Sequence, residues 1–310
     1  MINIIMCTYN GERYISEQIQ SIVDSSVKDW RLMIFDDQST DHTIQIIEKY
    51  QEKYSGQIYY KVNQKKQGVV LNFLKGIYEV GVQMNEHDLI MLCDQDDFWN
   101  TDKIRKTWNG MQELISAYGN NMPLLVCTDV TVVDDTMKVL NPSFRKMNHY
   151  HIKKLDLPHL LMENKVQGCT VMINRTMAGM LDRLPQTAVM HDSWLALIAA
   201  VFGRIKYIDE PTMRYRQHTD NLQGSIEYKK DIKNKFSNLG GQRQIVMKTI
   251  PQAAEFLKLY RNQIPSSPRS VIKAFATLPQ QNFVMRRYHI VRYHMWKSGI
   301  LRNIGLMVLI

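Results

Sequence analysis

Residues 89–97 are Leu89-Ile90-Met91-Leu92-Cys93-Asp94-Gln95-Asp96-Asp97, an apolar run that leads directly into three closely spaced carboxylates. An apolar run of this length predicts a strand that is buried on both faces, as in parallel sheets. Carboxylates this close together repel one another unless a cation lies among them. The stretch therefore predicts a buried parallel strand whose carboxyl end meets a metal ion or a metal-bound ligand.

A second apolar run, upstream of the first, also ends in closely spaced carboxylates. The run Leu32-Met33-Ile34-Phe35 leads directly into Asp36 and Asp37. Through residues 1–100, apolar runs alternate with stretches of helical periodicity, which predicts an α/β fold with a Rossmann-like, mostly parallel central sheet and flanking helices. Ligands bind such sheets at the carboxyl ends of the strands. The two acidic strand ends therefore indicate a site for a nucleotide carried with a metal ion.

Further elements follow from the same patterns. Strands are expected at residues 2–7, 58–62, 124–130, 169–173, 205–208 and 212–215. Helices are expected around residues 15–22, 44–50, 71–78, 104–111 and 190–202. Asp41 and Thr101 are of the residue types that cap helices, and each precedes an expected helix.

The excess of positive over negative charge lies entirely in the last part of the chain. The formal net charge is +9, but from Tyr228 onward the sequence has 15 Lys and Arg residues against only Asp231 and Glu255. The stretch Gln223-Gly224-Ser225 interrupts the pattern just before this region. We therefore expect a catalytic domain over residues 1–225 and a mainly helical, basic C-terminal region over residues 226–310. Such a region suits an anionic surface, either lipid or nucleic acid, and no nucleic-acid-binding module is recognisable in it.

Part of this basic region has the pattern of an amphipathic helix. Its apolar residues at helical spacing are Val284, Tyr288, Val291 and Met295, and its polar ones Arg286, His289 and Lys297. Two interpretations stay open. The apolar face contacts a membrane surface, or it packs against the catalytic domain.

The cysteines and the ends of the chain indicate a cytoplasmic protein. Cys7, Cys93, Cys127 and Cys169 form no closely spaced pair, which favours reduced thiols over a disulfide or zinc site. The first residues lack the pattern of a signal peptide, and no apolar stretch is long enough to span a bilayer. We expect a cytoplasmic protein that lies peripherally on the inner face of the plasma membrane.

Several motifs, taken together, resemble a known family. Three of them occur in its order, Thr8-Tyr9-Asn10-Gly11-Glu12, Asp36-Asp37-Gln38-Ser39-Thr40-Asp41 and Asp94-Gln95-Asp96-Asp97. Residues 1–222 resemble the family 2 glycosyltransferases, which have the GT-A fold. Five stretches more narrowly resemble bacterial rhamnosyltransferases of surface polysaccharide synthesis, namely Cys7-Thr8-Tyr9-Asn10-Gly11, Cys93-Asp94-Gln95-Asp96-Asp97-Phe98-Trp99, Gln167-Gly168-Cys169-Thr170, His191-Asp192-Ser193-Trp194 and Tyr215-Arg216-Gln217-His218. The chain departs from many relatives at Cys7, where they have proline.

The resemblance implies how a nucleotide-sugar donor is bound. The nucleotide base and ribose would be held by Thr8, Tyr9, Glu12 and Asp37. An Asp at this position accepts the N3–H that uracil and thymine share. The acidic stretch resembles the family's DxD motif, in which Asp94 and Asp96 contact the donor.

The resemblance also implies a divalent cation, Mg²⁺ or Mn²⁺. It would be ligated by Asp96 and Asp97, with Asp94 supporting them and His218 as a further ligand. Both ions prefer carboxylates and phosphate oxygens.

Catalytic roles follow from the same resemblance. Asp192 stands where the family has its catalytic base, and a single displacement assisted by one base inverts the configuration at the sugar. Gln167 and Gly168 would form a turn against the sugar, and Arg216 would offset the phosphate charge. Each motif also has a purely structural interpretation, in which Asp36, Asp37 and Asp192 only cap helices and Gln167-Gly168 is an ordinary turn.

These observations give one leading interpretation and two alternatives. The leading interpretation is a metal-dependent, inverting hexosyltransferase that moves L-rhamnose from dTDP-rhamnose to a lipid-linked saccharide in cell-surface polysaccharide synthesis. One alternative is a glycosyltransferase that uses a UDP-hexose. The other is a non-catalytic accessory protein of the same fold that binds polysaccharide or a membrane. A nucleotidyltransferase is disfavoured because a glycine-rich basic loop does not follow the first strand.

Overall fold

The computed structural model describes residues 1–218 and 239–310. Contacts between residues divide the chain into two compact units. The first comprises Met1–Phe144, Val166–Leu184 and Met190–Arg216, and the second comprises Arg145–Lys165, Pro185–Val189 and Gln217–Ile310. The boundary expected after residue 225 lies outside the described residues.

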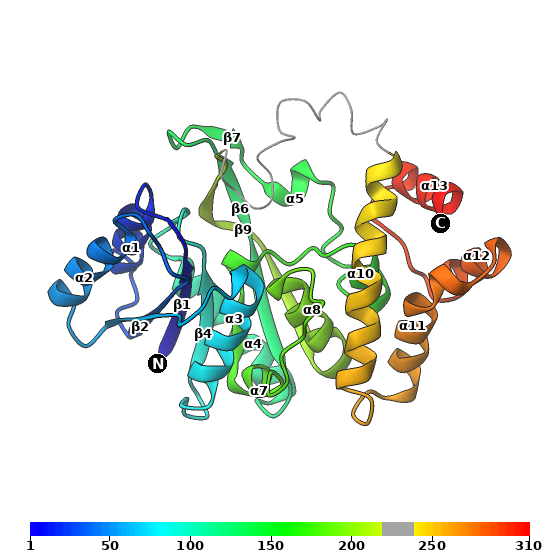
Figure 1. Cartoon of the computed structure of the whole chain (residues 1–310), viewed down its shortest axis with the longest axis horizontal. Coiled ribbons are helices and arrows are strands. Elements are labelled where there is room, and N and C mark those ends of the chain that lie inside the picture. The colour runs from blue at the N-terminus through cyan, green and yellow to red at the C-terminus, as the bar shows by residue number, and fades with distance from the viewer. Residues whose placement is uncertain (219–238) are drawn as a thin grey trace. The chain divides into compact units, whose positions relative to one another are not determined.

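The first unit is built on a mixed sheet whose strands are mostly parallel (Figure 1). Its strands are β1 (Ile2–Thr8), β2 (Trp30–Asp36), β3 (Ile58–Val62), β4 (Leu89–Cys93), β5 (Phe98–Trp99), β6 (Leu124–Val133), β7 (Val139–Asn141), β8 (Met172–Asn174) and β9 (Arg204–Arg216). They lie in the order β3-β2-β1-β4-β8-β6-β9-β5, and β7 pairs with β6. β8 runs antiparallel to both of its neighbours, β5 runs antiparallel to β9, and β7 runs antiparallel to β6.

The register of the parallel strands brings the two acidic strand ends to one edge. β1 lies between β2 and β4, with Thr8 opposite Asp36 and Met6 opposite Cys93. Every residue of β1 and of β4 is buried, as expected for strands covered on both faces. The residues that follow these strands, including Asp37 and Asp94, therefore emerge side by side at the carboxyl edge of the sheet.

Helices cover both faces of this sheet. The first layer is α1 (Ile15–Val23), α2 (Thr43–Lys53) and α4 (Lys103–Tyr118), which share one apolar core with the inner strands. The second layer is α3 (Gly68–Gly81), α7 (Arg175–Gly179) and α8 (His191–Phe202), which contact one another. Ile15, Ile19 and Ile22, the periodic residues of the first expected helix, are fully buried. The predicted α/β architecture is confirmed.

One predicted strand is shorter than expected. We expected a strand over residues 169–173, but Gly168–Thr170 forms a 3₁₀ turn and β8 begins at Met172. Both the N–H and the hydroxyl of Thr170 donate to the Gln167 carbonyl, which closes the turn and delays the strand.

Two further local predictions differ from the structure. Residues 205–208 and 212–215 are strand, as expected, but they belong to the single strand β9, because the β6–β9 ladder skips a bulge before Pro211 and then resumes. Thr101 does not cap α4, since the helix begins at Lys103 after Asp102, and the Thr101 carbonyl instead accepts from the Ser26 N–H.

The second unit is mainly helical where it is described, as predicted for the basic C-terminal region. Its helices of six residues or more are α6 (Leu157–Met162), α10 (Leu239–Leu259), α11 (Ser266–Ala276), α12 (Phe283–Arg292) and α13 (Ile300–Leu309). The short α5 (Phe144–Met147) lies at the junction of the two units, and η2 (Leu278–Gln280) follows α11. α10 contacts α6, α11 and α13, and its buried apolar side chains include Val246, Ile250, Ala253 and Phe256.

The amphipathic stretch predicted in this region forms α12, but three of the four apolar side chains expected on its apolar face are exposed. Val284, Tyr288 and Val291 are each more than half exposed. Met295, expected on the same face, lies beyond the end of the helix and is buried. Of the helices that the structure describes, none combines the length and apolar character that crossing a membrane requires.

Candidate active site

At the end of β1, Thr8 is tied to the end of β2. The Thr8 hydroxyl donates to Asp36 Oδ2 over 2.7 Å, and Ser39 donates to the same carboxylate through its N–H and its hydroxyl. Asp36 is fully buried. Asp36 therefore shapes the turn after β2 and does not cap α2, which begins at Thr43 after His42.

Asp37 lies next to Asp36 but serves a different segment. Its carboxylate accepts from the N–H groups of Gln67 and Gly68 over 2.7 and 2.8 Å and from the Asn63 amide over 2.9 Å. Asp37 thereby caps the start of α3. Helix capping was one of the two roles that the sequence left open for this residue. A carboxylate has about four acceptor positions, so these contacts leave room for one more donor.

Tyr9 is joined to the acidic loop after β4. Its N–H donates to the Gln95 side-chain carbonyl over 3.0 Å, and the Gln95 amide donates back to the Tyr9 carbonyl over 3.1 Å. A Cβ on Gly11 would lie 2.4 Å from the same Gln95 side chain, so only glycine allows this approach. The loops after β1 and β4 are therefore held in register with each other.

Glu12 contacts a neighbouring turn. Its carboxylate accepts from the N–H of His42 over 2.8 Å and lies 2.7 Å from His42 Nδ1. These hydrogen bonds from His42 lower the pKa of Glu12. Glu12, a predicted donor-binding residue, therefore binds the turn that carries His42.

The acidic loop after β4 concentrates negative charge. Asp97 is fully buried, whereas Asp94 and Asp96 are half-buried. Burial, then Asp96, then Asp192 raise the pKa of Asp94 to about 8. Burial, then Asp96, then Asp94 raise the pKa of Asp97. These shifts have the direction expected for buried carboxylates that lie close together.

The donor atoms in this loop suit a hard divalent cation. Oxygen atoms of Asp94 and Asp97 and the sulfur of Cys169 lie within 4.8 Å of one another. Burial and then Asp97 raise the pKa of the Cys169 thiol, so it stays protonated and is a poor ligand. The carboxylates are therefore the atoms that fit Mg²⁺ or Mn²⁺. His218 falls in the second unit, and its role as a metal ligand stays a prediction.

Asp192 is in the first turn of α8 and is bound to the turn before β8. Its Oδ2 accepts from the Gly168 N–H over 3.0 Å. It lies near enough to Asp94 to contribute to the raised pKa of that residue. The predicted base and the predicted metal-binding loop are thus brought together, and Gly168 touches the base directly.

His191 explains why Gly168 is a glycine. The His191 ring is 2% exposed and stacks on Phe73, with 4.1 Å between ring centroids. A Cβ on residue 168 would lie 2.3 Å from His191 Nε2. Burial lowers the pKa of His191 to about 3, so the ring is neutral near pH 7.

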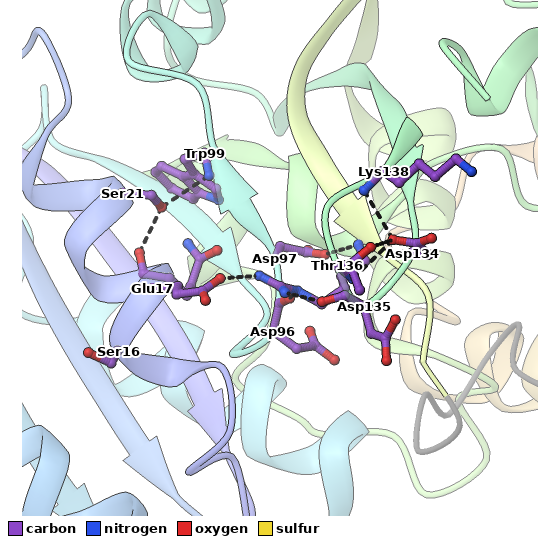
Figure 2. A network of polar contacts seen from close by, with 12 residues as sticks. Ser16, Glu17, Ser21, Asp96, Asp97, Trp99, Asp134, Asp135, Thr136 and Lys138 are labelled. Carbon is purple, nitrogen blue, oxygen red and sulfur yellow. Dashed lines mark hydrogen bonds and ion pairs between the residues drawn. The ribbon is translucent and has the colours of Figure 1, made fainter. Parts of the chain in front are cut away.

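Arg216, the last residue of β9, lies beneath the acidic loop. It is 2% exposed, and its backbone N–H donates to Asp97 Oδ1 over 3.1 Å. Glu17, Asp96 and Asp135 each supply an acceptor to its guanidinium, and Figure 2 shows these residues close to Asp97. The sequence motifs predicted a role for Arg216 but none for Gln95, although Gln95 lies within the acidic motif, and Glu17 and Lys103 lie outside every motif.

Lys103 adds a buried cation below the loop. It is fully buried, and its Nζ lies 4.9 Å from the centre of the Trp99 ring and 3.3 Å from Thr212 Oγ1. Burial lowers its pKa to about 8, while Cys169, Cys93 and Asp97 act in the opposite direction. A basic residue at the start of a helix is usually solvated, so sequence alone could not place it here.

Comparison with known proteins identifies the family. The family described as "Glycosyl transferase family 2" matches residues 3–168, and the chain belongs to this family. Among curated relatives, the dTDP-rhamnosyl transferase RfbG of Shigella flexneri is 31% identical over 239 residues, covering 74% of this chain and 77% of that protein. The putative teichuronic acid biosynthesis glycosyltransferase TuaG of Bacillus subtilis (strain 168) is 26% identical over 210 residues, covering 65% of this chain and 73% of that protein.

Solved structures show the same fold. A crystal structure of S. aureus TarS 1-349 in complex with UDP-GlcNAc matches with a TM-score of 0.55 at 14% identity, covering 95% of this chain and 76% of that one. The mannosyltransferase PcManGT from Pyrobaculum calidifontis in complex with GDP-Man and Mn²⁺ matches with a TM-score of 0.52 at 15% identity, covering 99% and 78%. The chain is a glycosyltransferase with a GT-A-like fold, as its motifs predicted.

Proposed function

We propose that the chain is an inverting glycosyltransferase that moves L-rhamnose from dTDP-rhamnose to a lipid-linked saccharide acceptor in cell-surface polysaccharide synthesis. The observation that carries this proposal is the position of Asp192 beside the carboxylates of the acidic loop. The likeness to a curated dTDP-rhamnosyl transferase supports the choice of donor.

The loops after β1 and β2 would bind the nucleoside. Thr8, Tyr9 and Glu12 lie at or just after the end of β1, and Asp37 follows β2. The acceptor position left on the Asp37 carboxylate suits the N3–H of thymine or uracil. Because this contact does not distinguish the two bases, a UDP-hexose is the alternative donor.

The acidic loop and Asp192 would carry out the reaction. Asp94 and Asp96 would contact the donor, and Asp96 and Asp97 would hold Mg²⁺ or Mn²⁺, with Asp94 supporting them from within 4.8 Å of Asp97 and His218 as a further ligand. When bound, the cation would neutralise charge that develops on the leaving diphosphate. Asp192 would remove the proton of the acceptor hydroxyl as that oxygen attacks the anomeric carbon, which inverts the configuration. Gln167 and Gly168 would approach the sugar.

A donor screen tests this proposal. With Mn²⁺, the purified chain should turn over dTDP-rhamnose with a kcat/KM at least about tenfold above that of any UDP-hexose, a typical discrimination between related substrates. Removal of the cation with EDTA should abolish turnover of every donor. A preference for a UDP-hexose would overturn the donor assignment only. Failure to bind or turn over any nucleotide sugar with either cation would overturn the proposal as a whole.

We further propose that α12 and α13 contact an anionic membrane surface, which would place the enzyme at the cytoplasmic face of the membrane beside a lipid-linked acceptor. The exposed apolar side chains on these helices include Val284 and Tyr288 of α12 and Ile300 and Ile304 of α13. Arg287 of α12 donates to backbone carbonyls at the end of α13, so the two helices are joined. Exposed apolar residues beside arginines suit a surface of anionic lipid.

Vesicle flotation tests the membrane contact. The chain should float with phosphatidylglycerol-containing vesicles and not with pure phosphatidylcholine vesicles. The double variant Val284→Glu, Ile304→Glu should reduce the floating fraction about tenfold or more, because it places two charges in the interface. The control is Val82→Glu, at a similarly exposed valine in the first unit. Equal flotation of both variants would overturn this contact.

A further inference from the structure

Every nitrogen of the Arg216 guanidinium donates to an acceptor within the protein. Nε donates to the Asp96 carbonyl over 2.9 Å, one terminal nitrogen donates to the Asp135 carbonyl over 3.0 Å, and the other forms an ion pair with Glu17. Its carbon lies 4.5 Å from the centre of the Tyr14 ring. A side chain that is 2% exposed and held in this way is fixed in one conformation.

These contacts join the acidic loop to two other segments. The loop is held twice, through the Asp96 carbonyl and through the Asp97 carboxylate, which accepts from the Arg216 backbone N–H. Glu17 belongs to α1, and Asp135 belongs to the turn between β6 and β7, which Asp134 closes by accepting from the N–H groups of Thr136 and Lys138 (Figure 2).

Helix α1 also anchors the residues that follow the acidic loop. The Trp99 N–H donates to the Ser21 hydroxyl of α1 over 3.0 Å, so α1 holds the chain just beyond Asp97 as well (Figure 2). The backbone that presents Asp94, Asp96 and Asp97 therefore has anchors on α1 and at the end of β9.

The charge balance argues against direct contact between Arg216 and a phosphate. Glu17 already pairs with the guanidinium, and its carboxylate is more than half exposed at the border of the loop. To reach a diphosphate, the Arg216 guanidinium would have to leave one carboxylate and two carbonyls, and these acceptors would lose the hydrogen bonds that it donates.

We infer that Arg216, held by Glu17, is a positioning residue that fixes the acidic loop for cation binding and does not itself contact the donor. This inference rests on the proposed function, in which the loop holds a divalent cation. It replaces the direct phosphate contact that the sequence motif suggested for Arg216. Residues that orient metal ligands typically change metal affinity by about 10–100-fold when they are replaced.

The two roles of Arg216 predict opposite effects of Glu17→Gln. Under the positioning role, the variant loosens the loop and weakens dTDP binding about tenfold in Mn²⁺, with a change of less than about twofold in EDTA. If Arg216 instead contacts phosphate, removal of the competing carboxylate frees the guanidinium and tightens dTDP binding. Isothermal titration of the full chain with dTDP, with Mn²⁺ and with EDTA, measures both values.

Further variants keep the test decisive. Arg216→Lys should weaken dTDP binding in Mn²⁺ at least as much as Glu17→Gln, and the double variant should be no weaker than Arg216→Lys alone, because both changes break one unit. The matched control is Glu79→Gln, which removes one partner of the exposed Lys61–Glu79 ion pair and should leave dTDP binding unchanged. Thermal unfolding of each variant verifies that it is folded.

The outcomes separate this inference from the function it rests on. Suppose that the wild-type chain binds dTDP more tightly in Mn²⁺ than in EDTA, and that Glu17→Gln binds dTDP as tightly as wild type or more tightly. This result would overturn the positioning role alone. Wild-type chain that fails to bind dTDP under either condition would overturn the proposed function, and the positioning role with it.

Discussion

Asp192→Asn is expected to lower kcat for sugar transfer by about 10²–10⁴-fold, the usual contribution of a general base. The amide cannot take the acceptor proton. Its carbonyl oxygen can still accept from the Gly168 N–H, so the turn before β8 should keep its conformation. Donor affinity should therefore change by less than about threefold, since the lost interaction acts on the acceptor and not on the nucleotide.

Steady-state kinetics and dTDP titration of the same preparation measure both effects. Asp182→Asn is the control, because Asp182 is an exposed carboxylate of the same unit and should leave kcat unchanged. A folded Asp192→Asn protein that had lost donor binding would show that Asp192 is structural. Near-normal transfer would show that another group is the base.

Gly168→Ala is expected to have the second-largest effect. The added methyl would lie 2.3 Å from His191 Nε2, and the His191 ring is held in place by its stack on Phe73. The turn must move, and it carries with it the N–H that holds Asp192. A displacement of about 1 Å at a catalytic group can cost roughly 10²-fold in kcat. Overpacking should also reduce the free energy of unfolding by about 1–3 kcal/mol.

Kinetics and urea unfolding, compared with two further variants, measure this effect. Gly179→Ala is the matched control, since no heavy atom lies within 4 Å of its added Cβ, and it should be neutral or slightly stabilising. The double variant Gly168→Ala, His191→Ala makes room for the methyl and should recover part of kcat. If Gly168→Ala alone were as active as wild type, the turn would not position Asp192.

The sheet and its acidic edge could be predicted because they depend on local pattern. The apolar runs that end at Cys93 and at Phe35 are typical of buried strands, and parallel strands bring their carboxyl ends to one edge. The structure places Thr8 opposite Asp36 in that way. The prediction went wrong where a local turn competed with a strand, as at Cys169, where hydrogen bonds to Gln167 form a 3₁₀ turn instead.

The contacts that orient the site could not be predicted from the sequence, because they join residues that are far apart along the chain. Glu17 and Arg216 are 199 residues apart, and Gln95 and Tyr9 are 86 apart. In the sequence, Glu17 has the character of an ordinary surface residue, and nothing in the acidic motif indicates that its Gln95 contacts Tyr9. Only the packing of α1 and β9 beside the acidic loop gives these side chains partners and, with them, a role.

The position of Arg216 at the very end of the first unit also has a consequence for how the protein folds during synthesis. The ion pair with Glu17 and the β6–β9 ladder both need β9, so neither can form until almost all of this unit has left the ribosome. Contacts between distant residues slow folding and leave unpaired strands exposed for longer. A nascent chain that ends before β9 should lack a finished donor site, so nucleotide sugar can stabilise the unit only after its last strand has been made.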